Sequence, residues 1–249
     1  MHKGIYGKMN RAARRAYRRR VTAGLCSLAM VFSGAAVQPS GWLMGGTVAA
    51  YAAETVSADA VQIDIGTLKI EDGQCIYIIG KDGDYHLTGC NLRNGVRVPT
   101  QIRVAEGVHA NLYLDGVDIV NTNGAYGGCG ESDIESTIPL DFCGDAVVYI
   151  VEDCKVGTNF NHAVSIEENV SVTVEEGRKL TVAADGKDKA GIQVDGTLYI
   201  NGGEIKATAG DKGPGIGFVS ESKGRIVING GRVTAEGDWA AGIGAGQSS

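Results

Sequence analysis

A ten-residue segment occurs twice near the end of the chain. Gly196-Thr-Leu-Tyr-Ile-Asn-Gly-Gly-Glu-Ile205 is followed 28 residues later by Gly224-Arg-Ile-Val-Ile-Asn-Gly-Gly-Arg-Val233. Each copy combines a short apolar strand, an Asn-Gly-Gly turn and a second apolar stretch. A unit this small cannot bury its apolar face alone, so it must stack on copies of itself. The repeat therefore predicts a solenoid, in which each copy forms part of one coil.

Further copies extend the pattern towards the N-terminus. A first series of strands is apolar at every second residue and comprises 101–104, 163–166, 191–194, 215–218 and 242–244. A second series comprises 112–114, 149–151, 172–174, 198–200 and 226–228. A third series consists of the apolar pairs Val117 and Ile119, Cys154 and Val156, Leu180 and Val182, Ile205 and Ala207, and Val233 and Ala235. Successive strand residues point to opposite faces, so one residue in two is expected inside the coil.

The spacing of the first series predicts how the coils align. The first apolar position of successive coils falls at Ile102, Leu140, Val164, Ile192, Ile216 and Ile243. These spacings are 38, 24, 28, 24 and 27 residues, so one coil is about ten residues longer than the others. If the coils stack, these six residues form one continuous aliphatic ladder through the interior.

Composition is consistent with this architecture and leaves two rivals. The chain contains 38 Gly and 4 Pro, a balance that also occurs in flexible linkers. Strict alternation of Ile, Val and Leu beside the glycines argues against disorder. A two-sheet sandwich also fits many short strands, but it gives no reason for near-identical sequence at a fixed offset. We therefore predict an all-β fold: a single-stranded parallel β-helix, or right-handed β-solenoid of the pectin-lyase type, with an N-terminal cap.

Residues 1–52 have the features of an export signal. Eight basic residues and no acid lie within residues 1–20, an apolar stretch spans residues 21–37, and Ala50-Tyr51-Ala52 matches an A-x-A cleavage pattern. Gln38-Pro39-Ser40-Gly41 interrupts the apolar stretch, which is short for a membrane span. We expect cleavage, a secreted or cell-surface location and no membrane span in the mature chain, with retention as an uncleaved anchor as the alternative.

Removal of this leader makes the chain strongly acidic. It takes away 8 of the 23 basic residues and none of the 29 acidic residues, which leaves a net charge of −14. This balance argues against nucleic acid, anionic lipid and polyanionic sugars as partners. It also suits solubility outside the cell. A glycan or a host or cell-surface protein remains as the expected partner.

The mature chain is predicted to form one domain. Residues 53–98 are expected to form a lead-in and N-terminal cap or first coil, because an exposed solenoid end would template edge-to-edge pairing. Residues 99–249 are expected to form the repeats. The chain stops at Gly244-Ala-Gly-Gln-Ser-Ser249, as a new coil begins, so we expect a continuation beyond this end.

Five cysteines follow the leader, and export permits disulfides. Cys75 and Cys90 flank a predicted hairpin through Lys81-Asp82-Gly83-Asp84, and they are the first expected pair. Cys129 with Cys143 would close the long coil. Cys154 occupies an inward position and is expected to be a buried thiol. The cysteines and histidines do not have metal-ligand spacing, so no zinc-type site is predicted.

The long coil is the candidate recognition site. Residues 121–137 loop out of an otherwise regular stack and carry Tyr126 with the carboxylates Glu131, Asp133 and Glu135. Loops on a rigid scaffold often carry binding function. The tyrosine could stack on a sugar ring, and the carboxylates could accept hydroxyl hydrogen bonds or ligate Ca²⁺, although no cofactor is required. A tolerated insertion without a ligand is the alternative.

Outward aromatic residues provide a second candidate surface. Tyr113 and Tyr199 alternate with inward apolar residues, and Trp239 lies in a loop. Such residues bind polysaccharides or simply pack laterally in a sheet. Tyr113 and Tyr199 are predicted to lie about three coils apart, so they do not form one platform.

Several motifs together resemble one known family. They are the segments 82–89, 102–108 and 112–119 and the repeated Gly-Ile-Gly and Ile-Asn-Gly-Gly motifs. The chain resembles the glycine-rich β-helical repeat regions of large surface proteins from anaerobic bacteria, which are described as adhesin-like or carbohydrate-binding-domain proteins. The resemblance covers residues 82–246 and implies a surface location and an adhesive or glycan-binding role. It supplies no catalytic motif to transfer.

A polysaccharide lyase or hydrolase is the enzymatic alternative, since β-helices also form such enzymes. A hydrolase needs two carboxylates on one groove. The acidic positions Asp115, Asp118, Glu152, Asp153, Glu175 and Glu176 recur at the corner of coil after coil, which is typical of solvated turns rather than of one site. We therefore predict a non-catalytic module, with a passive surface stalk as a third possibility.

Overall fold

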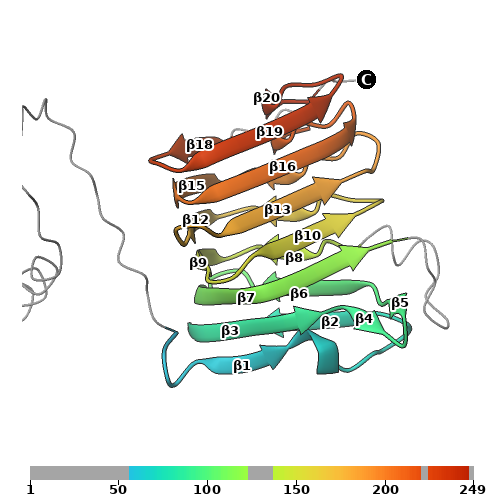
Figure 1. Ribbon diagram of the computed structural model, residues 1–249, viewed down its shortest axis with the longest axis vertical. Coiled ribbons are helices and arrows are strands. Elements are labelled where there is room, and N and C mark those ends of the chain that lie inside the picture. The colour runs from blue at the N-terminus through green and yellow to red at the C-terminus, as the bar shows by residue number, and fades with distance from the viewer. Residues whose placement is uncertain (1–55, 123–136, 220–223, 247–249) are drawn as a thin grey trace, which may run out of the picture. The chain divides into compact units, whose positions relative to one another are not determined.

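The computed structural model describes residues 56–122, 137–219 and 224–246 (Figure 1). The chain divides into two units, Met1–Ala52 and Ala53–Ser249, and all described residues belong to the second. The predicted leader therefore lies outside the described residues. Within the described part, the regular elements are twenty strands and one short 3₁₀ turn, η1 (Ile65–Thr67), and no helix there has the length and hydropathy to cross a membrane.

Two parallel sheets contain nearly all of the strands. The first comprises β1 (Val61–Asp64), β3 (Gly83–Cys90), β7 (His109–Asn121), β9 (Asp145–Ile150), β10 (Cys154–Thr158), β12 (Asn169–Val174), β13 (Lys179–Ala184), β15 (Thr197–Gly202), β16 (Glu204–Asp211), β18 (Arg225–Ile228) and β19 (Arg232–Asp238). The second comprises β2 (Cys75–Ile79), β6 (Thr100–Val104), β8 (Leu140–Phe142), β11 (Val164–Ile166), β14 (Ile192–Val194), β17 (Ile216–Phe218) and β20 (Ile243–Ala245). An antiparallel hairpin, β4 (Leu92–Arg93) with β5 (Val96–Arg97), stands apart.

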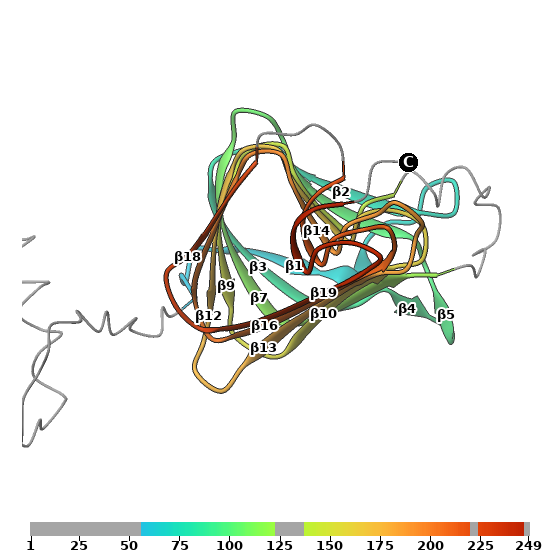
Figure 2. The ribbon, with the colours of Figure 1, turned by 90° about the horizontal axis from the view of Figure 1, so that it is seen from above.

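The coils that begin with β8, β11, β14 and β17 each contribute one strand to the second sheet and then two to the first, whereas in the coil that begins with β6 the long strand β7 pairs with both β9 and β10. Within the two sheets, neighbouring strands pair in parallel from coil to coil, and the order β18-β15-β12-β9-β7-β10-β13-β16-β19 shows the two halves of the first sheet extending from β7. Seen from above (Figure 2), the chain runs anticlockwise while the coils rise towards the C-terminal end, so the solenoid is right-handed. The predicted all-β parallel β-helix is confirmed.

The predicted aliphatic ladder is confirmed at every step. In the second sheet, Ile102 pairs with Leu140, Leu140 with Val164, Val164 with Ile192, Ile192 with Ile216 and Ile216 with Ile243. The first five of these residues are buried in the core, and Ile243 is partly exposed on the last coil. The extra residues of the long coil fall between β7 and β8, outside the stacked strands. An insertion at a corner therefore leaves the register of the sheet unchanged.

The third predicted series is also confirmed, whereas the second was misaligned. Cys154 pairs with Leu180 and Leu180 with Ile205, as expected. In the second series, however, Tyr149 pairs with Tyr113 rather than with Leu112. The inward residues of β9 are Ala146, Val148 and Ile150, which are buried. The strand therefore places Tyr149 on the outer face, where the sequence prediction had an inward residue.

The stack begins within the region that was expected to form the cap. β2 and β3 pair with β6 and β7, and β1 lies beneath β3. The segment Lys81–Asp84 joins these two strands, which belong to different sheets. It is therefore a solenoid corner, and the prediction of a hairpin at this point is wrong.

Steric fit and hydrogen bonding explain why the sequence Asn-Gly-Gly recurs at the corners. Gly203 has a φ of +67°, and a Cβ there would lie 2.3 Å from the Cβ of Val174 in the coil below. Only glycine combines a left-handed conformation with so close an approach. One coil further on, Asn229 donates from Nδ2 to Asn201 Oδ1 over 2.8 Å. The repeated motif therefore joins successive corners along the solenoid axis.

Candidate functional site

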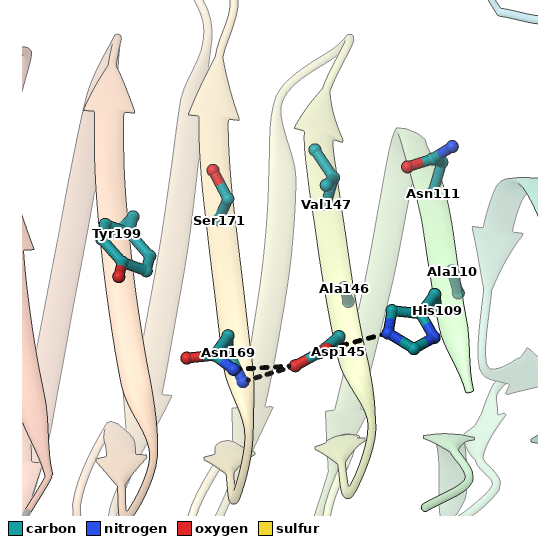
Figure 3. Close-up of a pocket in the computed structure, with 9 residues that line it drawn as sticks. All are labelled: His109, Ala110, Asn111, Asp145, Ala146, Val147, Asn169, Ser171 and Tyr199. Carbon is teal, nitrogen blue, oxygen red and sulfur yellow. Dashed lines mark hydrogen bonds and ion pairs between the residues drawn. The ribbon is translucent and has the colours of Figure 1, made fainter. Parts of the chain in front are cut away.

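The outer face of the first sheet contains a shallow depression across four coils. It has a volume of about 360 Å³. The lining residues come from β7, β9, β12 and β15 and are His109, Ala110, Asn111, Asp145, Ala146, Val147, Asn169, Ser171 and Tyr199 (Figure 3). We call this surface the polar flank. It brings together residues from a span of ninety positions in the chain, because each coil returns to the same face.

Strand periodicity explains why polar side chains gather here. Ala110, Ala146, Val170 and Leu198 are stacked in register and buried. Their neighbours on either side must point outward. One outward column runs from His109 through Asp145, and a second runs from Asn111 through Val147 and Ser171 to Tyr199.

Asp145 lies at the centre of a hydrogen-bonded row. Its Oδ1 accepts from both the backbone N and Nδ2 of Asn169, each at 3.0 Å. Its Oδ2 lies 3.1 Å from Nε2 of His109 on the other side (Figure 3). The hydrogen bonds from Asn169 lower the pKa of Asp145 below its ordinary value, with a smaller contribution from the charge of His109. The carboxylate therefore stays ionised and has both oxygens engaged.

The neighbouring polar groups are partly engaged. Asn111 donates from Nδ2 to Asp84 Oδ1 over 2.8 Å, which orients its carbonyl oxygen away from that contact. Ser171 Oγ accepts from Asn201 Nδ2 over 2.7 Å, which leaves the hydroxyl hydrogen for another acceptor. These contacts hold the side chains in place while they still present hydrogen-bonding groups to solvent.

The aromatic residues of the outer face fall into two groups. Tyr113 and Tyr199 lie on β7 and β15, three coils apart as predicted. Tyr113 is only 5 % exposed and stacks on Tyr149, with ring centroids 5.0 Å apart. Tyr199 belongs to the depression. Tyr113 therefore contributes to lateral packing of the sheet, and Tyr199 is the predicted ligand residue that the structure places in a concave surface.

The predicted recognition loop is largely outside the described residues. Tyr126, Glu131, Asp133 and Glu135 all fall within 123–136, as does Cys129. The residues that flank this segment are firmly held. Asn121 is fully buried, and its Oδ1 accepts from the backbone N of Thr100 over 2.9 Å and from Asn91 Nδ2 over 3.2 Å. Thr137 is 2 % exposed and donates to Gln74 Oε1 over 3.2 Å.

The cysteines do not form the expected bridge. Cys75 and Cys90 are both free thiols in the structure, so the predicted pair is wrong. They lie on β2, which pairs with β6, and on β3, which pairs with β1 and β7, so β2 and β3 do not pair as a hairpin that would bring the two thiols together. Cys143 is also free, while its expected partner Cys129 lies outside the described residues. Cys154 is a buried free thiol as predicted, and burial raises its pKa to about 11.

A second polar cluster lies on the outer side of the second sheet. Asp141, Cys143 and Glu167 present ligand atoms within 4.8 Å of one another. Arg103 already occupies this cluster, with Nε 3.4 Å from Asp141 Oδ2 and Nη2 donating to Cys143 Sγ over 3.0 Å. Burial raises the pKa of Cys143 to about 11, and the charge of Asp141 adds to this shift. A protonated thiol beside a guanidinium is a poor cation site.

The acidic corners that recur along the chain have local partners. Arg178 makes two contacts with Glu152, at 2.8 and 2.7 Å, and Asp153 accepts from the backbone N of Lys179 over 2.9 Å. Asp118 pairs with Arg97 at 2.7 Å. A smaller hollow of about 270 Å³ adjoins the polar flank and is lined by Glu106, Gly107, Val108, His109, Gly144, Asp145 and Glu168. Glu152, Asp153 and Asp118 thus stabilise turns, whereas Glu106, Asp145 and Glu168 line the smaller hollow.

Most residues of the polar flank were missed in the sequence. Only Tyr199 was singled out. The signal was present in the pattern Ala110-Asn-Leu-Tyr-Leu114, which aligns with Ala146-Val-Val-Tyr-Ile150. That alignment gives the correct register for β7 and β9, and with it the outward columns.

Comparison with known proteins supports the architecture. The beta helix repeat family matches residues 198–217 and 226–247, which contain most of the last two coils. The chain is thus a β-helical repeat protein. No curated protein matches the chain, and no solved structure matches it.

Proposed function

We propose that this β-solenoid is a secreted or surface-displayed, non-catalytic module that binds carbohydrate through the polar flank. The observation that carries the proposal is the depression itself, which combines fixed amide and hydroxyl groups with Tyr199 on a rigid sheet. Sugar-binding surfaces need oriented hydrogen-bonding groups beside an apolar ring face. The leader-like sequence of residues 1–52 and the acidic balance of the remaining chain favour an extracellular location.

The state of Asp145 favours binding over catalysis. Glycoside hydrolysis requires a general acid with a raised pKa and a second carboxylate at a defined distance. Among the described residues that line the depression, Asp145 is the one carboxylate, and hydrogen bonds from Asn169 lower its pKa. A carboxylate held in this way accepts hydrogen bonds but does not deliver a proton. Its role is to orient Asn169 and His109.

A glycan array probed with the full-length chain tests the proposal. We expect binding to at least one class of oligosaccharide, and we expect Tyr199→Ala to weaken it. The matched control is Thr181→Ala, an outward residue on β13 that does not line the depression. Absence of binding to every glycan would refute the proposal in favour of a passive stalk. Release of shorter products from a bound polysaccharide would refute the non-catalytic assignment.

A further inference from the structure

The hydrogen-bonding state of the polar flank restricts the class of glycan that it can accept. This step rests on the proposed carbohydrate-binding function and concerns the same surface. The relevant features are the charge of the floor, the groups left unpaired and the direction in which the depression extends.

The floor of the depression presents no unpaired charge. Both oxygens of Asp145 are engaged, by Asn169 on one side and by His109 on the other. The lining residues include no Lys or Arg. An anionic sugar would therefore meet no cation that is free to pair with it. A cationic amino sugar would have to compete with His109 for Asp145, the one carboxylate among the described residues that line the depression.

The groups that remain suit hydroxyls. Asn111 and Asn169 each donate from Nδ2, to Asp84 and Asp145 respectively, and their Oδ1 atoms accept no hydrogen bond from the described residues. Ser171 retains its hydroxyl hydrogen after accepting from Asn201. Neutral acceptors and a neutral donor match sugar hydroxyls, which both donate and accept. They give a desolvated carboxylate or ammonium no compensating charge.

The depression extends along the solenoid axis. It is lined by four successive strands, β7, β9, β12 and β15 (Figure 3). Three inter-strand steps of about 4.8 Å give a length of about 14 Å, which exceeds that of a single sugar ring. Tyr199 lies at one end of this row and His109 at the other. A short oligosaccharide lying across the strands would reach both ends.

We infer that the polar flank binds an uncharged, hydroxyl-rich oligosaccharide that lies along the solenoid axis, with hydroxyls donating to Asn111 and Asn169 and one ring packed on Tyr199. Recognition by neutral groups makes the affinity nearly independent of salt, because no ion pair is formed. Specificity against charged glycans arises because their charged groups would be desolvated without a partner.

Titration of the full-length chain with matched hexasaccharides tests this inference. The probes are the neutral hexamers of β-linked glucose, xylose and mannose, an anionic hexagalacturonate and a cationic hexamer of glucosamine, each measured by calorimetry at 50 and 500 mM NaCl. We expect at least one neutral hexamer to bind at least tenfold more tightly than either charged hexamer, with less than a twofold effect of salt. Tightest binding of a charged hexamer would overturn the inference and leave glycan binding intact. Silence with all five probes would overturn both.

A charge placed in the depression provides the matched variant test. Val147 lies between Asn111 and Ser171 in the outward column, so Val147→Lys puts a cation in the middle of the depression. We expect at least a tenfold loss of affinity for the neutral hexamer, whereas Thr181→Lys on β13 should change it less than twofold. Asn111→Ala, which removes one acceptor, should cost about threefold to tenfold. Unchanged neutral binding in both Val147→Lys and Asn111→Ala, with cooperative unfolding retained, would place the ligand elsewhere.

Discussion

The two halves of the first sheet have the same interior and different exteriors. The polar flank, on β7, β9, β12 and β15, presents amides, a hydroxyl and Tyr199. The other half, on β10, β13, β16 and β19, presents charged side chains that pair across coils, and we call it the charged flank. Lys179 lies 3.1 Å from Glu204, and Lys206 lies 4.0 Å from Glu236.

The interior of the two flanks shows no such difference. In a single coil, Leu198 of the polar flank and Ile205 of the charged flank are both essentially inaccessible to solvent. Inward positions are aliphatic on both flanks, because burial of apolar surface drives the stacking of coils in both halves of the sheet. Outward positions carry no such requirement. The comparison teaches that the fold depends on the inward set of residues, whereas the alternate, outward set is free to differ and forms the surface proposed to bind a ligand.

Substitution of an inward residue by Ala should have the largest effect on stability, and the effect should be equal on both flanks. We expect Leu198→Ala and Ile205→Ala each to lower the free energy of unfolding by about 2–5 kcal/mol, because each leaves a cavity in a ladder that runs through every coil. Urea denaturation followed by circular dichroism measures both. If one flank tolerated the substitution and the other did not, the equivalence of the two interiors would be wrong.

The corner that follows the charged flank should make stability depend on pH. Burial, assisted by the charge of Lys189, lowers the pKa of His162 to about 4, and its Nδ1 accepts from the backbone N of Ala190 over 2.9 Å. The unfolded chain takes up this proton near pH 6.5, before the folded chain does. The contribution of neutral His162 to the free energy of unfolding is therefore complete above pH 6.5. It is lost as the pH falls towards 4, and the loss is at most about 3 kcal/mol.

The variant His162→Asn isolates this contribution, since an amide oxygen can accept from Ala190 without titrating. The difference between the unfolding free energies of the wild type and the variant, measured between pH 4 and 8, should be constant above pH 6.5, and the wild type should lose stability relative to the variant as the pH falls from 6.5 towards 4. Parallel profiles would show that His162 does not titrate on unfolding in this range.

Removal of the ring of Tyr199 should weaken glycan binding with little effect on stability, which would distinguish the outward residues of the polar flank from its inward residues. We expect Tyr199→Ala to weaken glycan binding about threefold to tenfold, because aromatic packing contributes about 0.5–1.5 kcal/mol. The free energy of unfolding should change less than in Leu198→Ala, the adjacent inward substitution. Calorimetry gives the first quantity and denaturation the second. Equal affinity in Tyr199→Ala and wild type would exclude this ring from the binding surface.

The smallest effect is expected on the charged flank. Lys179→Ala removes a surface ion pair with Glu204 and should lower the free energy of unfolding by no more than about 1 kcal/mol, less still at 500 mM NaCl. Glycan affinity should not change. A loss of affinity comparable to that in Tyr199→Ala would show that the ligand also contacts this half of the sheet.

Inward positions were the most predictable part of the molecule. Ile102, Leu140, Val164, Ile192 and Ile216 were aligned correctly across coils of unequal length, because glycine corners and apolar alternation mark the start of each strand. The misalignment of Tyr149 shows the limit. β9 contains Val147 and Val148 in succession, so apolar alternation alone admits two registers that differ by one residue.

Turn chemistry was a weaker guide. The acidic glycine turn at Lys81–Asp84 resembles a hairpin turn and a solenoid corner equally well in sequence, and the choice decided whether Cys75 and Cys90 could meet. β2 pairs in parallel with β6, and β3 pairs in parallel with β1 and β7, so the two strands belong to different sheets. Local sequence could not reveal that the partners of β2 and β3 lie in other coils.

The amino-acid sequence by itself determined that the chain coils, where each coil begins and, apart from the register of β9, which side chains face the interior, because apolar strands repeated at a fixed offset are buried by stacking on their copies. Only the tertiary structure decided which outward side chains share a surface. His109, Asp145 and Asn169 become neighbours because parallel hydrogen bonding sets the register between coils, whatever the length of the corners that join them.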